Sequence, residues 1–202
     1  MARVVANMSV SLDGFVADAG DGVGEVFSWY RKGDVPIGAA GDAEAGFRVA
    51  AASAELLSQT WARVGALVAG RRTFDLAKGW GGEPPLGAHA FVVSHTVPDG
   101  WPRPGTPFTF VTEGGVEAAV AQAKAHAGDR TVAVSGADTT RRCLNARLID
   151  EISIDLVPVL LGSGVRYLDH LANTPVWLGD PRVVEGAGVT HLTYEVHYSP
   201  QA

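Results

Sequence analysis

Strand-like and helix-like segments alternate along most of this sequence, and that order restricts the fold more than any other feature. Short apolar runs typical of buried strands lie at 65–70, 90–94 and 131–135. Segments with helical spacing lie at about 42–62, 73–79 and 115–128. Because helices join the successive strands, the crossover connections predict an α/β fold: a mostly parallel central sheet with helices on both faces.

The C-terminal part differs, because its strand-like segments follow one another without a helix. The segment 150–162 predicts one long strand, and 176–198 predicts two more that are joined by Gly-rich turns. We therefore expect an antiparallel C-terminal edge. No linker, repeat or low-complexity segment interrupts the 202 residues, so the sequence predicts a single domain over 1–202.

Composition limits the partners and the location of the protein. A formal net charge of −6 argues against binding to nucleic acid or to an anionic membrane. The sequence contains no run of basic residues that could neutralise a series of phosphates. Cys143 is the only cysteine, which precludes an intrachain disulfide and fits a reducing compartment. The N-terminus does not resemble a signal peptide and no stretch is long enough to span a bilayer, so we expect a cytoplasmic protein.

Three loops follow strand-like runs, at the edge where open α/β sheets bind ligands. In the first, Gly70 lets the backbone approach a ligand, and Arg71 and Arg72 precede a helix expected to begin at Thr73. Guanidinium groups beside a helix start are typical of an anion site, although a solvated basic turn with a helix cap is the alternative interpretation. The other two loops consist of Ser94, His95 and Thr96, and of Ser135, Gly136 and Ala137 before an expected cap at Asp138 or Thr139.

Other chemistries find little support in the sequence. Cys143 lies inside a predicted helix without a nearby histidine, which is typical of a buried small residue. The six histidines include no pair at metal-ligand spacing, so no metal site is expected. There is no G-x-S-x-G nucleophile elbow, and "GDGVG" (20–24) lacks the last glycine of a dinucleotide fingerprint.

Five motifs occur in the order "SLDGFVA", "AGRRTFD", "VVSHT", "SGADTT" and "LIDEISIDLVPVLLGSG". In this combination the sequence resembles the dihydrofolate-reductase-like superfamily over essentially its whole length. The branch that it resembles contains the reductase domain of the bacterial riboflavin-biosynthesis deaminase–reductase. The resemblance implies the corresponding fold and an NADPH cofactor bound across the sheet.

The resemblance also assigns the cofactor contacts. Gly70 and Arg71 would meet the adenosine 2′-phosphate together with Ser94, His95 and Thr96. Arg72 and Thr73 would meet the pyrophosphate from one side. The other side would be formed by Ser135, Gly136, Ala137, Asp138, Thr139 and Thr140.

The N-terminal strand would hold the nicotinamide. From Ala6 to Leu12 apolar residues alternate with the small polar residues Asn7, Ser9 and Ser11, and this small face would leave room for a flat ring. By the resemblance, the nicotinamide would lie by Ser9, Val16 and Ala17. The following segment, "DGFVADAGDG", would be a mobile loop that closes over the ring.

Two departures argue against dihydrofolate as substrate. The acidic residue expected three positions before Trp29 is replaced by Val26, and the position of an Arg that holds the folate tail is Ala88. The remaining candidates for the proton donor are Asp155, Asp13 and Glu25, although Asp13 also fits a simple Asp-Gly turn. The aromatic residues expected to contact substrate are Phe15, Trp29 and Trp80.

The sequence thus predicts an NADPH-dependent oxidoreductase. Its expected substrate is a small planar heteroaromatic or carbonyl compound, such as a pyrimidine, a pterin or a flavin-like ring. An NADPH-binding protein without turnover, sensor-like or regulatory, is the alternative, and a structural dimerisation module is a third possibility. We also expect a homodimer, because the C-terminal strands 175–198 carry many apolar residues at a sheet edge that needs covering.

Overall fold

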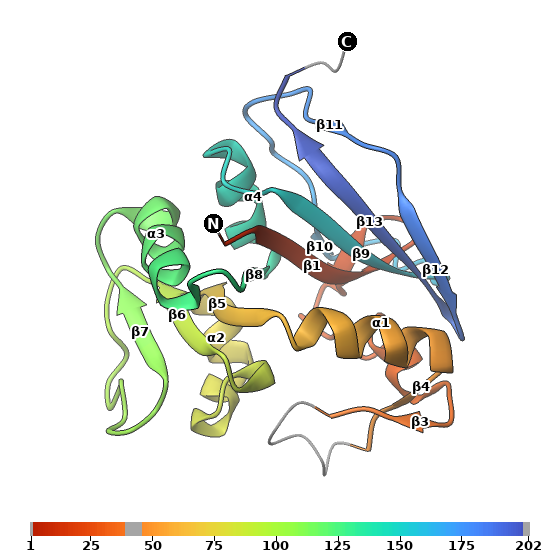
Figure 1. The fold of residues 1–202 in the computed structure, drawn as a ribbon, viewed down its shortest axis with the longest axis horizontal. Helices are drawn as coiled ribbons and strands as arrows, with labels where there is room; N and C mark the ends of the chain where they lie inside the picture. Colours follow the sequence, from red (N-terminus) through yellow and green to blue (C-terminus); the bar gives the residue numbers. More distant parts are fainter. Residues whose placement is uncertain (1, 39–45, 200–202) are drawn as a thin grey trace.

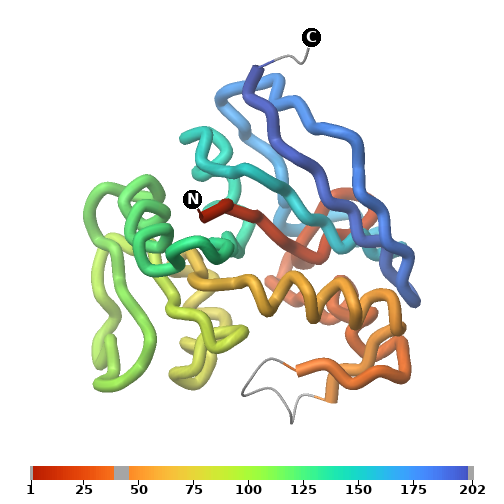
Figure 2. The backbone as a smooth tube through the Cα atoms, viewed as in Figure 1, coloured from red at the N-terminus to blue at the C-terminus, as the bar shows by residue number. Residues whose placement is uncertain are grey.

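The computed structural model describes residues 2–38 and 46–199, and its main feature is a nine-stranded sheet (Figures 1 and 2). Across the sheet the order is β11 (Trp177–Leu178), β13 (Val189–His197), β9 (Glu151–Val157), β1 (Val4–Ser11), β8 (Thr131–Ser135), β5 (Val64–Gly70), β6 (His89–Val93) and β7 (Phe108–Val111). β12 (Arg182–Gly186) also pairs with β13. All pairs from β9 to β7 are parallel, whereas β11, β12 and β9 run antiparallel to β13. The predicted α/β fold with an antiparallel C-terminal edge is confirmed.

In the described part of the chain, four α-helices cover the sheet, two on each face (Figure 1). α3 (Gly115–Ala127) and α4 (Ala137–Asn145) lie on one side, and α1 (Ala51–Trp61) and α2 (Arg71–Leu76) lie on the other. Short 3₁₀ turns are η1 (Ser28–Arg31), η2 (Lys78–Gly82) and η3 (Pro85–Gly87). Two small antiparallel pairs complete the fold: β2 (Phe15–Ala17) with β10 (Val165–Arg166), and β3 (Val35–Pro36) with β4 (Arg48–Val49).

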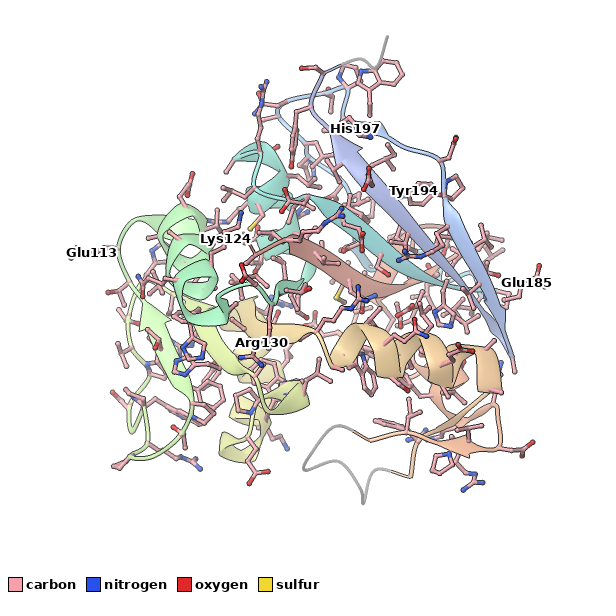
Figure 3. All side chains as sticks on the ribbon, viewed as in Figure 1. Glu113, Lys124, Arg130, Glu185, Tyr194 and His197 are labelled. Atoms are coloured by element: carbon pink, nitrogen blue, oxygen red, sulfur yellow. The ribbon has the colours of Figure 1, made fainter. Side chains whose placement is uncertain are left out.

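The largest part of the core lies between the sheet and α3 and α4. β1, β5 and β8 direct Val and Ala side chains to this face, where they pack against small residues of α3 such as Ala119 and Ala123. Small residues on both surfaces bring helix and sheet close together, and the packed layer keeps the strand ends in fixed positions. Figure 3 shows Glu113, which follows β7, and Glu185 of β12 at the two ends of the molecule.

Helix boundaries differ from those predicted. α1 begins at Ala51, because 48–49 form β4, and the predicted stretch 42–45 lies outside the described residues. α2 begins at Arg71, two residues before Thr73, because Gly70, the last residue of β5, is also the N-cap of the helix. α4 begins at Ala137, so its N-cap is Gly136 and the prediction of Asp138 or Thr139 is wrong.

The topology brings two helix starts together at one edge of the sheet. β5 and β8 are parallel neighbours in the middle of the sheet, with Ala69 opposite Ser135 at their carboxyl ends. The chain enters α2 directly after β5 and α4 almost directly after β8. Because carboxyl ends of parallel strands meet at one edge, the first turns of both helices lie side by side, where α/β sheets bind their ligands. Among the described residues no helix is both long and apolar enough to cross a membrane.

Candidate active site

The two strand–helix turns fit into one another through two glycines. A Cβ atom on Gly70 would lie 2.7 Å from Oγ1 of Thr139, and one on Gly136 would lie 2.5 Å from Oγ1 of Thr73. Gly136 also has a φ of +94°, a backbone conformation that other residues adopt only with strain. Each turn therefore needs its glycine so that the first turn of the opposite helix can pack against it.

No side chain among residues 2–38 and 46–199 caps the start of α2 or of α4. Without a capping oxygen, the first amide groups of each helix remain available as donors to a ligand. Thr139 and Thr140, which were expected to form part of one side of the phosphate site, are both buried. Asp138 is exposed and is held along the helix by Nε of Arg142 at 2.8 Å, so its charge is balanced within α4.

Arg71 joins the β5–α2 turn to the end of β6. Its Nε donates to both carboxylate oxygens of Asp75 at 2.9 Å. Its Nη1 lies 3.3 Å from the carbonyl oxygen of Thr96 and 3.5 Å from Oγ of Ser94. His95, between these two residues, is exposed. The structure thus brings together the predicted 2′-phosphate set and adds a carboxylate, Asp75, which the sequence analysis did not include.

Arg72 joins the same turn to the loop that follows β2. Its guanidinium donates to the carboxylate of Asp21, and this bond raises the pKa of Arg72. Asp18 organises the loop from within, because one of its carboxylate oxygens accepts from the amides of Gly20 and Gly22 at 2.7 and 2.8 Å. The loop predicted to close over the nicotinamide is therefore tied directly to the start of α2.

The residues predicted around the nicotinamide do not share one surface. Ser9 is 2% exposed, and its Oγ accepts from Nε1 of Trp29 at 3.0 Å on the side of α1. Val16 packs with Val10 and Tyr167. Because neighbouring residues of a strand point to opposite faces, Val10 and therefore Val16 lie on the other side of β1 from Ser9. Ala17 is buried beside Val16.

Between α1 and α2 the face of the sheet is uncovered. Asn7 of β1 is exposed, and Val5 of β1 and Ala133 of β8, which lie opposite each other, are half-buried. A hollow of about 350 Å³ is lined by α1, η3 and the end of β3, with Trp61, Leu86 and Ile37 among its wall residues. A flat ring could therefore contact the sheet directly between the two helices, beside the strand-end turns.

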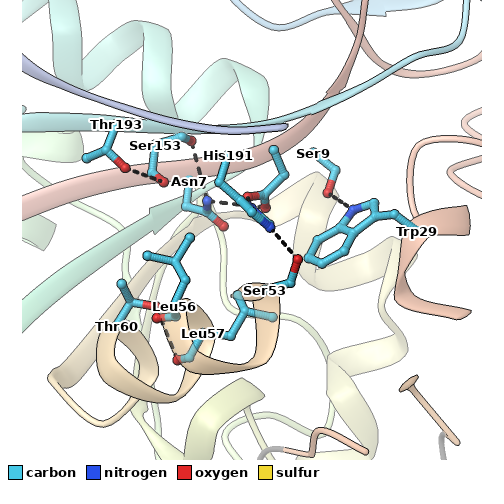
Figure 4. Close-up of polar contacts among 11 residues, drawn as sticks. Asn7, Ser9, Trp29, Ser53, Leu56, Leu57, Thr60, Ser153, His191 and Thr193 are labelled. Atoms are coloured by element: carbon cyan, nitrogen blue, oxygen red, sulfur yellow. Dashed lines mark hydrogen bonds and ion pairs between the residues drawn. The ribbon is translucent and has the colours of Figure 1, made fainter. Parts of the chain in front are cut away.

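A buried row of polar side chains lies next to this opening. Ser9, Asp155 and His191 are cross-strand neighbours on β1, β9 and β13. Oδ1 of Asp155 lies 2.7 Å from Nδ1 of His191, and Nε2 of His191 lies 2.8 Å from Oγ of Ser53 in the first turn of α1. Nδ2 of Asn7 donates to Oδ2 of Asp155 and to the carbonyl oxygen of Ser153, at 3.4 Å each (Figure 4). Asp155, one of the three predicted donors, thus connects the buried row to the exposed face.

The other two predicted proton donors have different surroundings. Asp13 accepts from Oγ of Ser11 at 2.6 Å and from the amides of Leu161 and Gly162. The Ser11 hydroxyl and these amides hold the pKa of Asp13 down at about 2, so its carboxylate fixes the turn after β1 to the loop after β9. Glu25 is exposed in the turn before η1.

The three predicted aromatic contacts are separated from one another. Trp29 is fully buried and stacks on Tyr30. Phe15 is covered by the guanidinium of Arg166 at 4.6 Å from its ring centre. Trp80 packs on Phe74 in the core beneath α2.

Ser53 and His191 were not among the residues predicted from the sequence, and Asn7 was assigned no role beyond its small size. One signal was present in the strand 189–197, where His191 and Thr193 share a strand face with the apolar Val189. A histidine at such an inward position requires partners, because a buried polar group must be hydrogen-bonded. The identity of those partners depends on the packing of α1 on β13, which local patterns do not reveal.

Comparison with solved structures identifies the class of fold. Dihydrofolate reductase from Enterococcus faecalis, solved as a complex with NADP(H), has the same fold with a TM-score of 0.52 at 16% identity, covering 96% of this chain and 94% of that one. A deaminase and 5-amino-6-(5-phosphoribosylamino)uracil reductase from Thermotoga maritima matches with a TM-score of 0.60 at 12% identity, covering 96% of this chain and 56% of that one. The chain therefore has a dihydrofolate-reductase-like fold.

The family is narrower than the fold. Residues 2–193 match the family model of the RibD C-terminal domain, and the chain belongs to that family. A putative riboflavin biosynthesis protein from Shewanella sp. PV-4 is similar along its whole length, with a TM-score of 0.73 and 25% identity, covering 98% of this chain and 99% of that one. No curated protein matches the sequence significantly. Family membership implies a reductase of the riboflavin-pathway type.

Proposed function

We propose that this protein is an NADPH-dependent reductase that acts on a small planar heteroaromatic substrate of the aminopyrimidine type. The observation that carries the proposal is Asp155, a buried carboxylate whose Oδ2 meets the exposed Asn7 at the uncovered sheet face. This face adjoins the two strand-end turns, so a ring placed on it would lie within reach of a cofactor held by the turns.

The residues of the turns fit a dinucleotide. The glycines at 70 and 136 allow the close backbone approach that a pyrophosphate needs, and the uncapped start of α4 offers amide donors to its negative charge. Arg71, already placed among Ser94, Thr96 and Asp75, would meet the 2′-phosphate, with Arg72 near the pyrophosphate. When bound, NADPH would supply the hydride.

Asn7 and Asp155 would select and orient the substrate. Both amide hydrogens of Asn7 are directed to Ser153 and Asp155, so its Oδ1 is left as an acceptor (Figure 4). Oδ2 of Asp155 is a second acceptor close by. Two neighbouring acceptors favour a ring edge with N–H and amino donors, as in an aminopyrimidine. Asp155 would also deliver the proton that balances the transferred hydride.

A second candidate, an NADPH-binding protein without turnover, is favoured by a different observation. Asp155 is only 3% exposed, and both arginines of the β5–α2 turn already pair with carboxylates of this chain. A regulatory protein would keep the cofactor contacts and need no substrate access to Asp155.

NADPH oxidation distinguishes the two candidates. Purified protein is mixed with NADPH and, in turn, 5-amino-6-(5-phosphoribosylamino)uracil, a simple aminopyrimidine, a pterin, a flavin and dihydrofolate. We expect oxidation with an aminopyrimidine and a kcat/KM for dihydrofolate below the usual enzyme range of about 10⁴–10⁸ M⁻¹s⁻¹. NADPH binding without oxidation of any member would support the second candidate, and absence of NADPH binding would reject both.

A further inference from the structure

Asp155, His191 and Ser53 have the distances of a Ser-His-Asp triad, with 2.7 Å and 2.8 Å between successive partners. A nucleophilic role for the serine is excluded by its position. Ser53 is fully buried, and its hydroxyl lies directly against Gly186, where a Cβ atom would overlap it. No electrophile could reach this oxygen without the removal of α1 from the sheet.

The hydrogen-bonded series Asp155–His191–Ser53 therefore presents its carboxylate, and not its serine, to the opening. Oδ2 of Asp155 meets Asn7, whose side chain is exposed, whereas Ser53 lies at the closed end beneath α1. His191 occupies the middle and is 1% exposed. Any chemical effect of His191 and Ser53 on a ligand must consequently be transmitted through Asp155.

The His191 ring is held from two further directions. Trp29 packs edge-on against it with ring centres 5.2 Å apart, and the Trp29 indole is itself fixed by Ser9. Tyr30 stacks on Trp29, and burial together with the negative charge of Asp155 raises the pKa of Tyr30, so this phenol stays protonated. The ring therefore has little freedom to turn, and its two nitrogens face Asp155 and Ser53 permanently.

We infer that His191 and Ser53 are positioning residues that orient the Asp155 carboxyl and hold its proton for the reductase reaction. When Ser53 donates to Nε2, the His191 proton lies on Nδ1 and is donated to Oδ1 of Asp155, which leaves Oδ2 for the substrate. Because Nδ1 already carries its proton, a further proton taken up from water binds Oδ2 of Asp155, the oxygen that faces the substrate. Transfer of this proton to the substrate, together with one hydride, completes a two-electron reduction and restores the first state.

Two carboxamide substitutions, each of which reproduces one ring nitrogen, separate the contacts of His191. The amide nitrogen of Asn in His191→Asn lies near the place of Nδ1 and preserves the donor to Asp155. In His191→Gln it lies near the place of Nε2 and preserves only the contact with Ser53. We expect His191→Asn to retain most of kcat and His191→Gln to lose about 10- to 100-fold, as when a partner that orients a reactive group is removed. KM and NADPH affinity should be unchanged in both.

Thr193→Val is the matched control, because Thr193 is the next inward residue of β13 and its hydroxyl contacts Ser153 rather than Asp155. Its kcat should equal that of the wild type. Equal kcat for His191→Asn and His191→Gln at unchanged KM would overturn the inference, since a purely structural histidine would affect stability and leave the two variants alike in turnover.

A second measurement needs no substrate and so separates this inference from the proposed function on which it rests. Nitrogen-15 NMR of the His191 ring in full-length protein reports which nitrogen carries the proton. We expect a proton on Nδ1 in the wild type and a changed protonation pattern in both Asp155→Asn and Ser53→Ala. Unchanged His191 signals in these variants would refute the positioning role, whereas changed signals without turnover of any substrate would refute only the proposed reductase.

Discussion

Asp155 shows that a carboxylate can be buried where its neighbours supply hydrogen bonds. Its carboxylate is enclosed by β1, β9 and β13, and its contacts are with the His191 ring and the Asn7 amide. A buried carboxylate without such partners would be strongly destabilising, because removal of a charge from water costs several kcal/mol, on the order of the stability of a small domain. These partners allow it to lie beside the opening.

Asp155→Asn tests the proton donor. The substitution preserves the shape of the side chain and removes its exchangeable proton, so we expect kcat to fall by roughly 10²-fold or more. NADPH affinity should be unchanged, since Asp155 does not contact the strand-end turns. Glu151→Gln, which removes an outlying carboxylate on the same strand, is the control and should leave kcat unaltered. Wild-type turnover in Asp155→Asn would show that Asp155 is not the proton donor.

Arg71→Ala tests the choice of cofactor. The 2′-phosphate distinguishes NADPH from NADH, and a charge-assisted contact to it contributes about 1.5–3 kcal/mol, or roughly ten- to 150-fold in affinity. We expect Arg71→Ala to weaken NADPH by that factor and to leave NADH nearly unaffected, as measured by titration calorimetry. Arg72→Ala, at the neighbouring position, should weaken both cofactors similarly. If the two variants behaved alike, Arg71 would contact the shared pyrophosphate instead.

Asp13 gives a prediction about stability and pH. Its pKa is about 2 in the folded protein and near 3.8 when unperturbed, so its ionised form favours folding. That contribution is complete above about pH 4 and is lost as the pH falls toward 2. Asp13→Asn should therefore lower Tm at neutral pH, and its difference from the wild type should shrink in acid. If the difference in Tm between the variant and the wild type did not change with pH, the charge of Asp13 would not contribute to stability.

At the scale of elements, order and type were predictable from the sequence and boundaries were not. The alternation of apolar runs with helical segments fixed the parallel sheet, because buried strands have few other arrangements. The start of α2 was placed two residues late and that of α4 two or three residues late, since Gly70 and Gly136 precede these helices without a capping side chain. Asn7 and His191 were not assigned because their partners are distant in sequence.

The contact between the β5–α2 and β8–α4 turns should be essential to the fold. In Gly136→Ala the new methyl would strain a φ of +94° and meet Thr73, so we expect a loss of about 1–3 kcal/mol in the free energy of unfolding. Gly128→Ala, with a φ of +66° and open space around it, isolates the backbone contribution. Urea unfolding of Gly136→Ala should show the larger loss, and Thr73→Ala in the same chain should recover part of it. Equal losses in the two variants would mean that the turns do not press on one another.

At the scale of the whole molecule, the family match and the sheet order agree on a reductase-type fold, and the C-terminal edge of that fold is incompletely covered. β11 and β12 lie at this edge, both paired with β13. The apolar residues of 175–198 were expected to form an edge that needs covering. Three of them, Trp177, Leu178 and Val183, expose 47%, 42% and 50% of their surface. Val196, in contrast, packs on the main core.

This distribution leads to the prediction of a homodimer. Exposed apolar side chains on an edge strand favour pairing with another sheet, and a second copy of the chain offers the same surface. A stable contact of this kind buries about 1,200–2,000 Å² in total. Light scattering at micromolar concentration should give twice the mass of the chain, and Val183→Asp together with Leu178→Asp should give the single mass while NADPH binding persists. Lys124→Asp, on α3 at a distance from this edge, is the charge control and should stay dimeric. A monomeric wild type would show that the apolar side chains of this edge remain exposed to water without a partner.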